Sequence, residues 1–140
     1  MTPSSSFRSD DTGKLLLRLA VGVVILFHGI FKVQHGVAWI SQMLSQHGLP
    51  GFLAYGAYVA EIIAPVLILL GYRTRLAAIV VAFDMVVAII LVLRQEIFAI
   101  KEMGGGWGIE LEALILLCAL ALFFMGGGAY GLKKGQSKWN

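Results

Sequence analysis

The chain has 140 residues, of which 59% are hydrophobic and only 14% are charged, and its mean hydropathy is +0.85. A soluble domain carries about a quarter charged residues, so the composition indicates a protein of the lipid bilayer. The net charge of +3 does not predict nucleic-acid binding, because the basic residues gather at the ends of apolar segments. The single cysteine, Cys118, excludes a disulfide within the chain.

The first stretch of the chain, residues 1–13, is polar and is predicted to be a disordered cytoplasmic tail. Four apolar runs follow, at residues 15–31, 52–70, 76–93 and 109–125. Each run has roughly 17–19 residues, which at about 1.5 Å per residue can cross a hydrocarbon core of about 30 Å. The runs lack the alternation of membrane strands. The sequence therefore predicts an all-α fold, an integral membrane four-helix bundle over residues 14–132, followed by a basic cytoplasmic tail at 133–140.

The connection between the first and second runs contains apolar residues at helical spacing around Trp39. This pattern predicts either that the first helix runs on or that a short helix lies at the membrane interface. The segment Gly48-Leu49-Pro50-Gly51 then breaks the chain before the second run. The connection between the third and fourth runs carries Gly104-Gly105-Gly106-Trp107-Gly108, a turn with an interfacial tryptophan.

Basic residues are distributed unequally between the two sides of the predicted bundle. Eight lie on the side of the termini, and three lie on the other side, at Lys32, Arg94 and Lys101. The eight are Arg8, Lys14, Arg18, Arg73, Arg75, Lys133, Lys134 and Lys138. Because basic residues accumulate on the cytoplasmic side of membrane proteins, both termini are predicted to be cytoplasmic.

Ionisable residues inside the apolar runs are the strongest functional signal, because each costs a few kcal/mol in a bilayer unless it has a partner or a wet cavity. The six candidates for a ligand or proton site are Arg18, His28, Lys32, Glu61, Asp84 and Glu110. Glu61 and Asp84 lie at similar depth near mid-membrane, and Arg18 is the expected counter-ion of Asp84. His28 and Lys32 form an i,i+4 pair that is expected to reach Glu110. Together the six residues predict a polar seam through the bundle.

Each of these residues also has a structural interpretation. The seam as a whole can fix helix register, Arg18 can extend to the headgroups, and Lys32 and Glu110 can be interfacial. Pro65, four residues after Glu61, is expected to free a backbone carbonyl, and Gly22 and Gly29 are expected to let helices approach closely. His28 and His35 leave a metal or haem site as an alternative, but no metal site is predicted.

Several stretches of the chain share an order and spacing with a known family. They are Arg18-Leu19-Ala20, Phe27-His28-Gly29 with Lys32, Gly48-Leu49-Pro50, Ala60-Glu61-Ile62, residues 70–76, Asp84-Met85, and Gly108-Ile109-Glu110. In this ordered set, which covers nearly all of residues 14–132, the chain resembles the DoxX family. The resemblance implies a small four-helix protein of the bacterial inner (plasma) membrane.

The resemblance also implies a link to redox chemistry. A small subunit of thiosulfate:quinone oxidoreductase is similar, and a mycobacterial member is associated with a membrane oxidoreductase complex. The predicted function is therefore a membrane subunit or anchor of a quinone- or sulfur-linked redox complex, with quinone as the candidate cofactor and a redox enzyme as the partner. Any activity is expected to be that of an oxidoreductase subunit rather than of a stand-alone enzyme. The alternatives are a non-catalytic scaffold or assembly factor, and a small-solute or proton conduit formed by a homo-oligomer.

Overall fold

The computed structural model describes residues 5–132, and within that range the chain is helical, with one isolated bridge between Ile100 and Trp107. In chain order the elements are α1 (Ser5–His35), α2 (Ala38–Gln46), η1 (Gly51–Tyr55), α3 (Gly56–Tyr58), η2 (Val59–Ile63), α4 (Ala64–Leu70), α5 (Thr74–Leu91), η3 (Arg94–Glu96) and α6 (Glu110–Met125). The predicted all-α class is confirmed.

Within the described range, three continuous helical segments are long and apolar enough to cross a membrane: Ser9–His35, Gly51–Leu70 and Thr74–Leu91. The second of them is built from η1, α3, η2 and α4 in succession. The fourth bundle helix, α6, has 16 residues, which span only about 24 Å at 1.5 Å per residue. The helical membrane bundle is confirmed, while a full crossing by α6 stays a prediction that needs a locally thinner bilayer.

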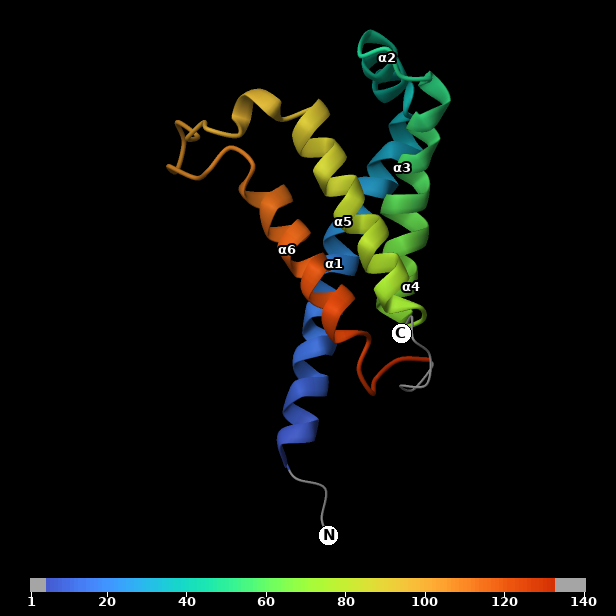
Figure 1. Ribbon diagram of the computed structural model, residues 1–140, viewed down its shortest axis with the longest axis vertical. Helices are drawn as coiled ribbons and strands as arrows, with labels where there is room; N and C mark the ends of the chain where they lie inside the picture. The colour runs from blue at the N-terminus through green and yellow to red at the C-terminus, as the bar shows by residue number, and fades with distance from the viewer. Residues whose placement is uncertain (1–4, 133–140) are drawn as a thin grey trace.

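The four long segments run alternately up and down, so that the start of α1 and the segment after α6 lie at the same end of the molecule (Figure 1). We call this the terminal end, which carries the turn at residues 71–73 and the segment 126–132. The opposite, loop end carries α2 and residues 92–109. Helix α5 packs along α6, and α1 packs along α4. Toward the loop end, the α5–α6 pair leans away from α2 and the second segment (Figure 1).

The main apolar core lies between these helices below the loop end. Helix α1 contributes Val21 and Ile25, α4 contributes Ile68, and α5 contributes Val81, all of them almost fully buried. Buried alanines on α5 and α6 bring those two helices close together. The outward faces keep large apolar side chains exposed, which suits contact with lipid.

Helix α1 begins at Ser5, so residues 5–13 of the predicted disordered tail are helical in the structure. Once the apolar part of α1 has formed, each further residue adds one hydrogen bond, and Pro3 lies upstream of the first helical turn. The Asp11 carboxylate also accepts a hydrogen bond of 3.0 Å from the Ala129 N–H. Residues 1–4 and the predicted basic tail at 133–140 lie outside the described residues.

The short helix predicted between the first two spans is present as α2. It is bounded by Gly36 and Gly48, whose φ angles of 77° and 73° lie in the left-handed region that glycine adopts without strain. These two turns place α2 across the loop end, above α3 (Figure 1).

Candidate functional site

Arg18 is 1% exposed and binds backbone carbonyls at the terminal end. Its Nε donates to the carbonyl of Ile68 at 2.8 Å, and its Nη2 donates to that of Leu69 at 2.7 Å. Its Nη1 donates to the carbonyls of Gly127 and Tyr130 at 3.0 and 3.1 Å. The expected pairing of Arg18 with Asp84 is therefore corrected: the guanidinium caps the C-terminus of α4, where carbonyls are unsatisfied and the helix dipole favours a cation.

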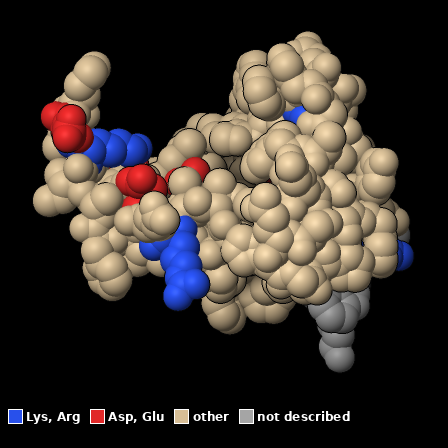
Figure 2. All heavy atoms as spheres, turned by 90° about the horizontal axis from the view of Figure 1, so that it is seen from above, with Lys and Arg blue, Asp and Glu red and all other residues tan. Residues whose placement is uncertain are grey.

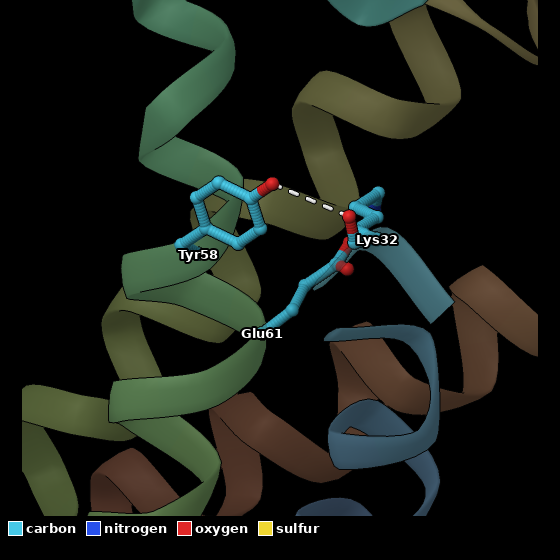
Figure 3. A network of polar contacts seen from close by, with 3 residues as sticks. All are labelled: Lys32, Tyr58 and Glu61. Carbon is cyan, nitrogen blue, oxygen red and sulfur yellow. Dashed lines mark hydrogen bonds and ion pairs between the residues drawn. The ribbon is translucent and has the colours of Figure 1, made fainter. Parts of the chain in front are cut away.

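Lys32 and Glu61 form the buried ion pair of the loop-end half (Figure 3). The Lys32 ammonium donates to Oε1 of Glu61, and the two side chains are 13% and 6% exposed. The Tyr58 hydroxyl donates to the backbone carbonyl of Lys32 at 3.2 Å, which ties the end of α1 to α3 (Figure 3). Lys32 was expected to reach Glu110, but it binds Glu61 instead.

Local backbone structure brings Glu61 to this position. Glu61 lies in η2, a π-helical turn, and Pro65 follows it four residues later without a backbone N–H to donate. A Cβ at Gly29 would overlap the Glu61 carbonyl oxygen, so the glycine allows α1 to touch the π-helical turn. Such π-helical turns are frequent at functional sites.

Asp84 completes what we call the cavity cluster, which consists of Lys32, Glu61 and Asp84. Asp84 is half-buried and lines the same cavity as Lys32 and Glu61. The cavity cluster therefore combines one ammonium with two carboxyls. The second carboxylate oxygen of Glu61, Oε2, is buried without a hydrogen-bond partner among the described residues. A buried acceptor left unpaired costs about 1–3 kcal/mol, and more if it is charged.

The cavity cluster lies in the wall of a cavity of about 560 Å³, the loop-end cavity. Helices α1, α2, α5, α6 and the second segment enclose it, and most of its lining is aliphatic or aromatic. The view onto the loop end shows acidic residues at the edge of a hollow in a largely uncharged surface (Figure 2). A shallow recess of about 410 Å³ adjoins the cavity and shares His28, Lys32 and Trp39 with it. Phe27 and Phe31 form the rest of the recess.

The other sequence candidates divide between the cavity and the surface. His28 is exposed and lies where the cavity and the recess meet. Glu110 lies outside the cavity lining and pairs with Lys101 at 3.0 Å, with both side chains about half exposed. The predicted seam thus separates into three groups: Arg18 at the terminal end, the cavity cluster with His28, and the surface pair of Glu110.

Sequence reasoning missed Glu112, a half-buried carboxyl in the cavity wall. A signal for it was present, because Glu112 precedes Ile115, Ala119 and Leu122 at spacings of three, four and three residues. Those three residues are buried, so Glu112 lies on the core-facing stripe of α6. Within residues 5–132, no group of three or more His, Cys, Asp or Glu side chains is arranged to hold a metal ion.

Comparison with known proteins identifies the family. The DoxX family model matches residues 13–94, which is more than half of the chain. The chain belongs to the DoxX family. This match contains α1, the second segment and α5, and therefore all three residues of the cavity cluster. The fourth helix, α6, lies beyond the matched range.

Two relatives match across most of their length. The Bacillus subtilis protein named "Putative oxidoreductase CatD" is 34% identical over 119 residues, which are 85% of this chain and 83% of the relative. An uncharacterized membrane protein of Mycobacterium tuberculosis is 32% identical over 132 residues, 89% of this chain and 81% of the relative. No solved structure gives a significant match. The protein is thus a DoxX-family membrane protein with a relative named for redox chemistry.

Proposed function

We propose that this DoxX-family protein is a membrane subunit of a redox complex and that its loop-end cavity binds the headgroup of a membrane quinone or quinol. The observation that carries the proposal is Oε2 of Glu61, a buried acceptor without a partner among the described residues, in the wall of a cavity of about 560 Å³. A ligand group at this position supplies the missing contact.

The shape of the site supports an amphipathic ligand. Ligand sites are concave, mostly apolar, and carry a few polar groups that fix orientation. Here the cavity cluster provides the polar groups, and residues such as Met85 and Leu91 provide apolar wall. The recess beside Phe27 and Phe31 offers a path for an isoprenoid tail along the lipid-facing side of α1. These features match a small polar ring on a long apolar chain.

The carboxyls suit the protons of quinone chemistry. When a quinol becomes a quinone, two O–H bonds break, and two protons and two electrons leave the ring. Glu61 and Asp84 are the groups placed to take the protons, and the two electrons pass to an oxidised redox centre of the partner enzyme. In the reverse direction the same carboxyls supply protons while the partner supplies electrons. The relative named as an oxidoreductase agrees with such a partnership.

We also propose that the terminal end faces the cytoplasm of a bacterium and that the loop end faces the outer side of the inner membrane. Arg73 and Arg75 lie at the turn into α5 on the terminal end, and Lys14 lies in the part of α1 nearest that end. An excess of basic residues on this side favours a cytoplasmic placement.

Purification in native lipid, followed by mass spectrometry of extracted lipids, tests the proposed ligand. We expect the wild-type protein to retain a quinone or quinol. Ala57→Phe should lose it, because Ala57 lines the cavity and a phenyl ring there would occupy its space. Ala20→Phe is the matched control, since Ala20 is exposed on α1 and is not a lining residue.

A wild-type protein that neither retains a quinone nor binds one added in detergent would overturn this proposal. If redox partner proteins then co-purified equally with both alanine variants, a scaffold role would account for the family membership. Proton or solute flux in liposomes that contain this chain alone would instead favour a conduit.

A further inference from the structure

Hydrogen-bond acceptors outnumber donors in the buried part of the loop-end cavity. Among the described residues that line it, the carboxyls of Glu61 and Asp84 share the cavity with one ammonium, that of Lys32, which pairs with Glu61. An ionised carboxylate offers about four lone-pair sites, and an ammonium offers three N–H donors. The cavity cluster therefore presents about eight acceptor sites against three donors.

The neighbouring polar groups do not remove this excess. The Tyr58 hydroxyl already donates to the Lys32 carbonyl, and Glu112 adds a further carboxyl to the wall. His28 and Trp39 have ring N–H groups, but both side chains are exposed at the rim of the cavity. Protonation of one of the two carboxyls would add one donor and remove one acceptor site, so acceptors would still be in excess.

From this imbalance we infer that the loop-end cavity prefers the reduced quinol to the oxidised quinone, an inference that rests on the proposed function. A quinol has two hydroxyl donors, and one of them can satisfy Oε2 of Glu61. A quinone ring has carbonyl acceptors at the same two positions. Its oxygens would compete with the carboxylates for the Lys32 N–H groups, and Oε2 of Glu61 would stay unpaired.

The preference is measured with decylubiquinol and decylubiquinone, titrated under anaerobic conditions into the full-length protein in detergent. A hydrogen bond to a charged acceptor corresponds to roughly tenfold or more in affinity. We therefore expect the quinol to bind at least about tenfold more tightly than the quinone.

Amide substitutions change the balance of donors without changing side-chain size. Glu61→Gln and Asp84→Asn each replace an acceptor with a group that also donates, so the quinol preference should fall to about equality or reverse. Asp84→Asn keeps the Lys32–Glu61 pair, so it tests the donor–acceptor explanation even if Glu61→Gln does not fold. Glu110→Gln is the matched control, because its carboxyl pairs with Lys101 away from the cavity lining, and it should keep the wild-type ratio.

The two proposals fail in different ways. If wild-type protein binds both forms equally, or binds the quinone more tightly, the quinol preference is wrong and the proposed quinone site remains. An unchanged preference in Asp84→Asn, or in folded Glu61→Gln, also contradicts the donor–acceptor explanation. If wild-type protein binds neither form, the proposed function itself is wrong.

Discussion

The two ends of the bundle hold their buried polar groups in opposite ways. At the terminal end, the Arg18 guanidinium donates to four carbonyls from α4 and from the segment after α6. At the loop end, Glu61 binds Lys32 through one oxygen, and its other oxygen lies in a cavity wall without a partner among residues 5–132. A buried cation that donates to several protein carbonyls stabilises the fold. A carboxylate with one oxygen unpaired beside a cavity is instead suited to binding a ligand.

The backbone at each end reinforces this difference. At the terminal end, the Leu132 N–H donates to the Leu70 carbonyl at 3.0 Å, and Gly71 and Gly131 lie against each other without side chains. Thr74 is an exception there, because its buried hydroxyl has no partner among the described residues. At the loop end, α2 and the α5–α6 pair stand apart (Figure 1). Residues of these helices line the loop-end cavity.

The largest effect on stability is expected for Arg18→Met. The variant leaves four carbonyls without their donor in a buried site, which should lower the free energy of unfolding by about 4 kcal/mol or more. Denaturant unfolding in detergent measures the loss. Arg73→Met is the matched control, since Arg73 is exposed beside the same turn, and should change stability by about 0.5 kcal/mol or less.

Lys32→Met is expected to have the next largest effect, because it leaves the buried Glu61 carboxyl without its cation. Breaking a buried ion pair at one partner costs about 3 kcal/mol or more. The double variant Lys32→Met/Glu61→Leu removes both charges, and it should recover most of that loss while still failing to bind quinol. If the double variant had as low a free energy of unfolding as the single variant, the Lys32–Glu61 pair would have a structural role like that of Arg18.

Gly29→Ala tests the contact that positions Glu61. The added methyl would overlap the Glu61 carbonyl, so α1 must move from the π-helical turn at a cost of about 1–3 kcal/mol. In the same helix, Gly13 has open space around it, and Gly13→Ala should raise stability by about 0.5–1 kcal/mol. Thermal unfolding of the two variants side by side gives the comparison, and equal shifts would contradict the close approach.

The smallest effect is expected at the surface pair of Lys101 and Glu110. Both side chains are about half exposed, and exposed pairs contribute about 0–1 kcal/mol. Lys101→Met should therefore change the free energy of unfolding by about 0.5 kcal/mol at most and should leave quinol affinity unchanged. A clear loss of quinol binding in this variant would place part of the site outside the loop-end cavity.

The helical fold could be predicted from the sequence because four long apolar runs leave few alternatives in a bilayer. The short helix α2 was also visible in the spacing of its apolar residues. The first turns of α1 could not be predicted. A helix that has formed over the apolar run can extend toward the N-terminus into polar residues, and composition alone does not show this. Residues 5–13 are helical for that reason, although their composition resembles a disordered tail.

The sequence indicates which ionisable residues lie in the membrane-spanning runs, but not which of them pair or share a cavity. Counting residues along a helix gives Glu61 and Asp84 a similar depth, and both line the loop-end cavity. It places Lys32 nearer the membrane boundary with Glu110 as its expected partner, whereas Lys32 binds Glu61. It does not show that the C-terminus of α4 offers carbonyls to Arg18. Nor does it show that Lys101 and Glu110 pair with each other away from the cavity. Those pairings depend on how each helix is rotated about its axis and tilted against its neighbours. The sequence of one apolar run does not determine either of these.

Photolabelling tests most directly whether the loop end is the binding end. A quinol analogue that carries a photoreactive azide is bound to the wild-type protein in native lipid, irradiated, and mapped by peptide mass spectrometry. We predict labels on cavity residues near Lys32, Ala57 and Ala88, and their suppression by excess decylubiquinol. Labels confined to the lipid-facing surface or to the terminal end, and unaffected by the competitor, would contradict the account.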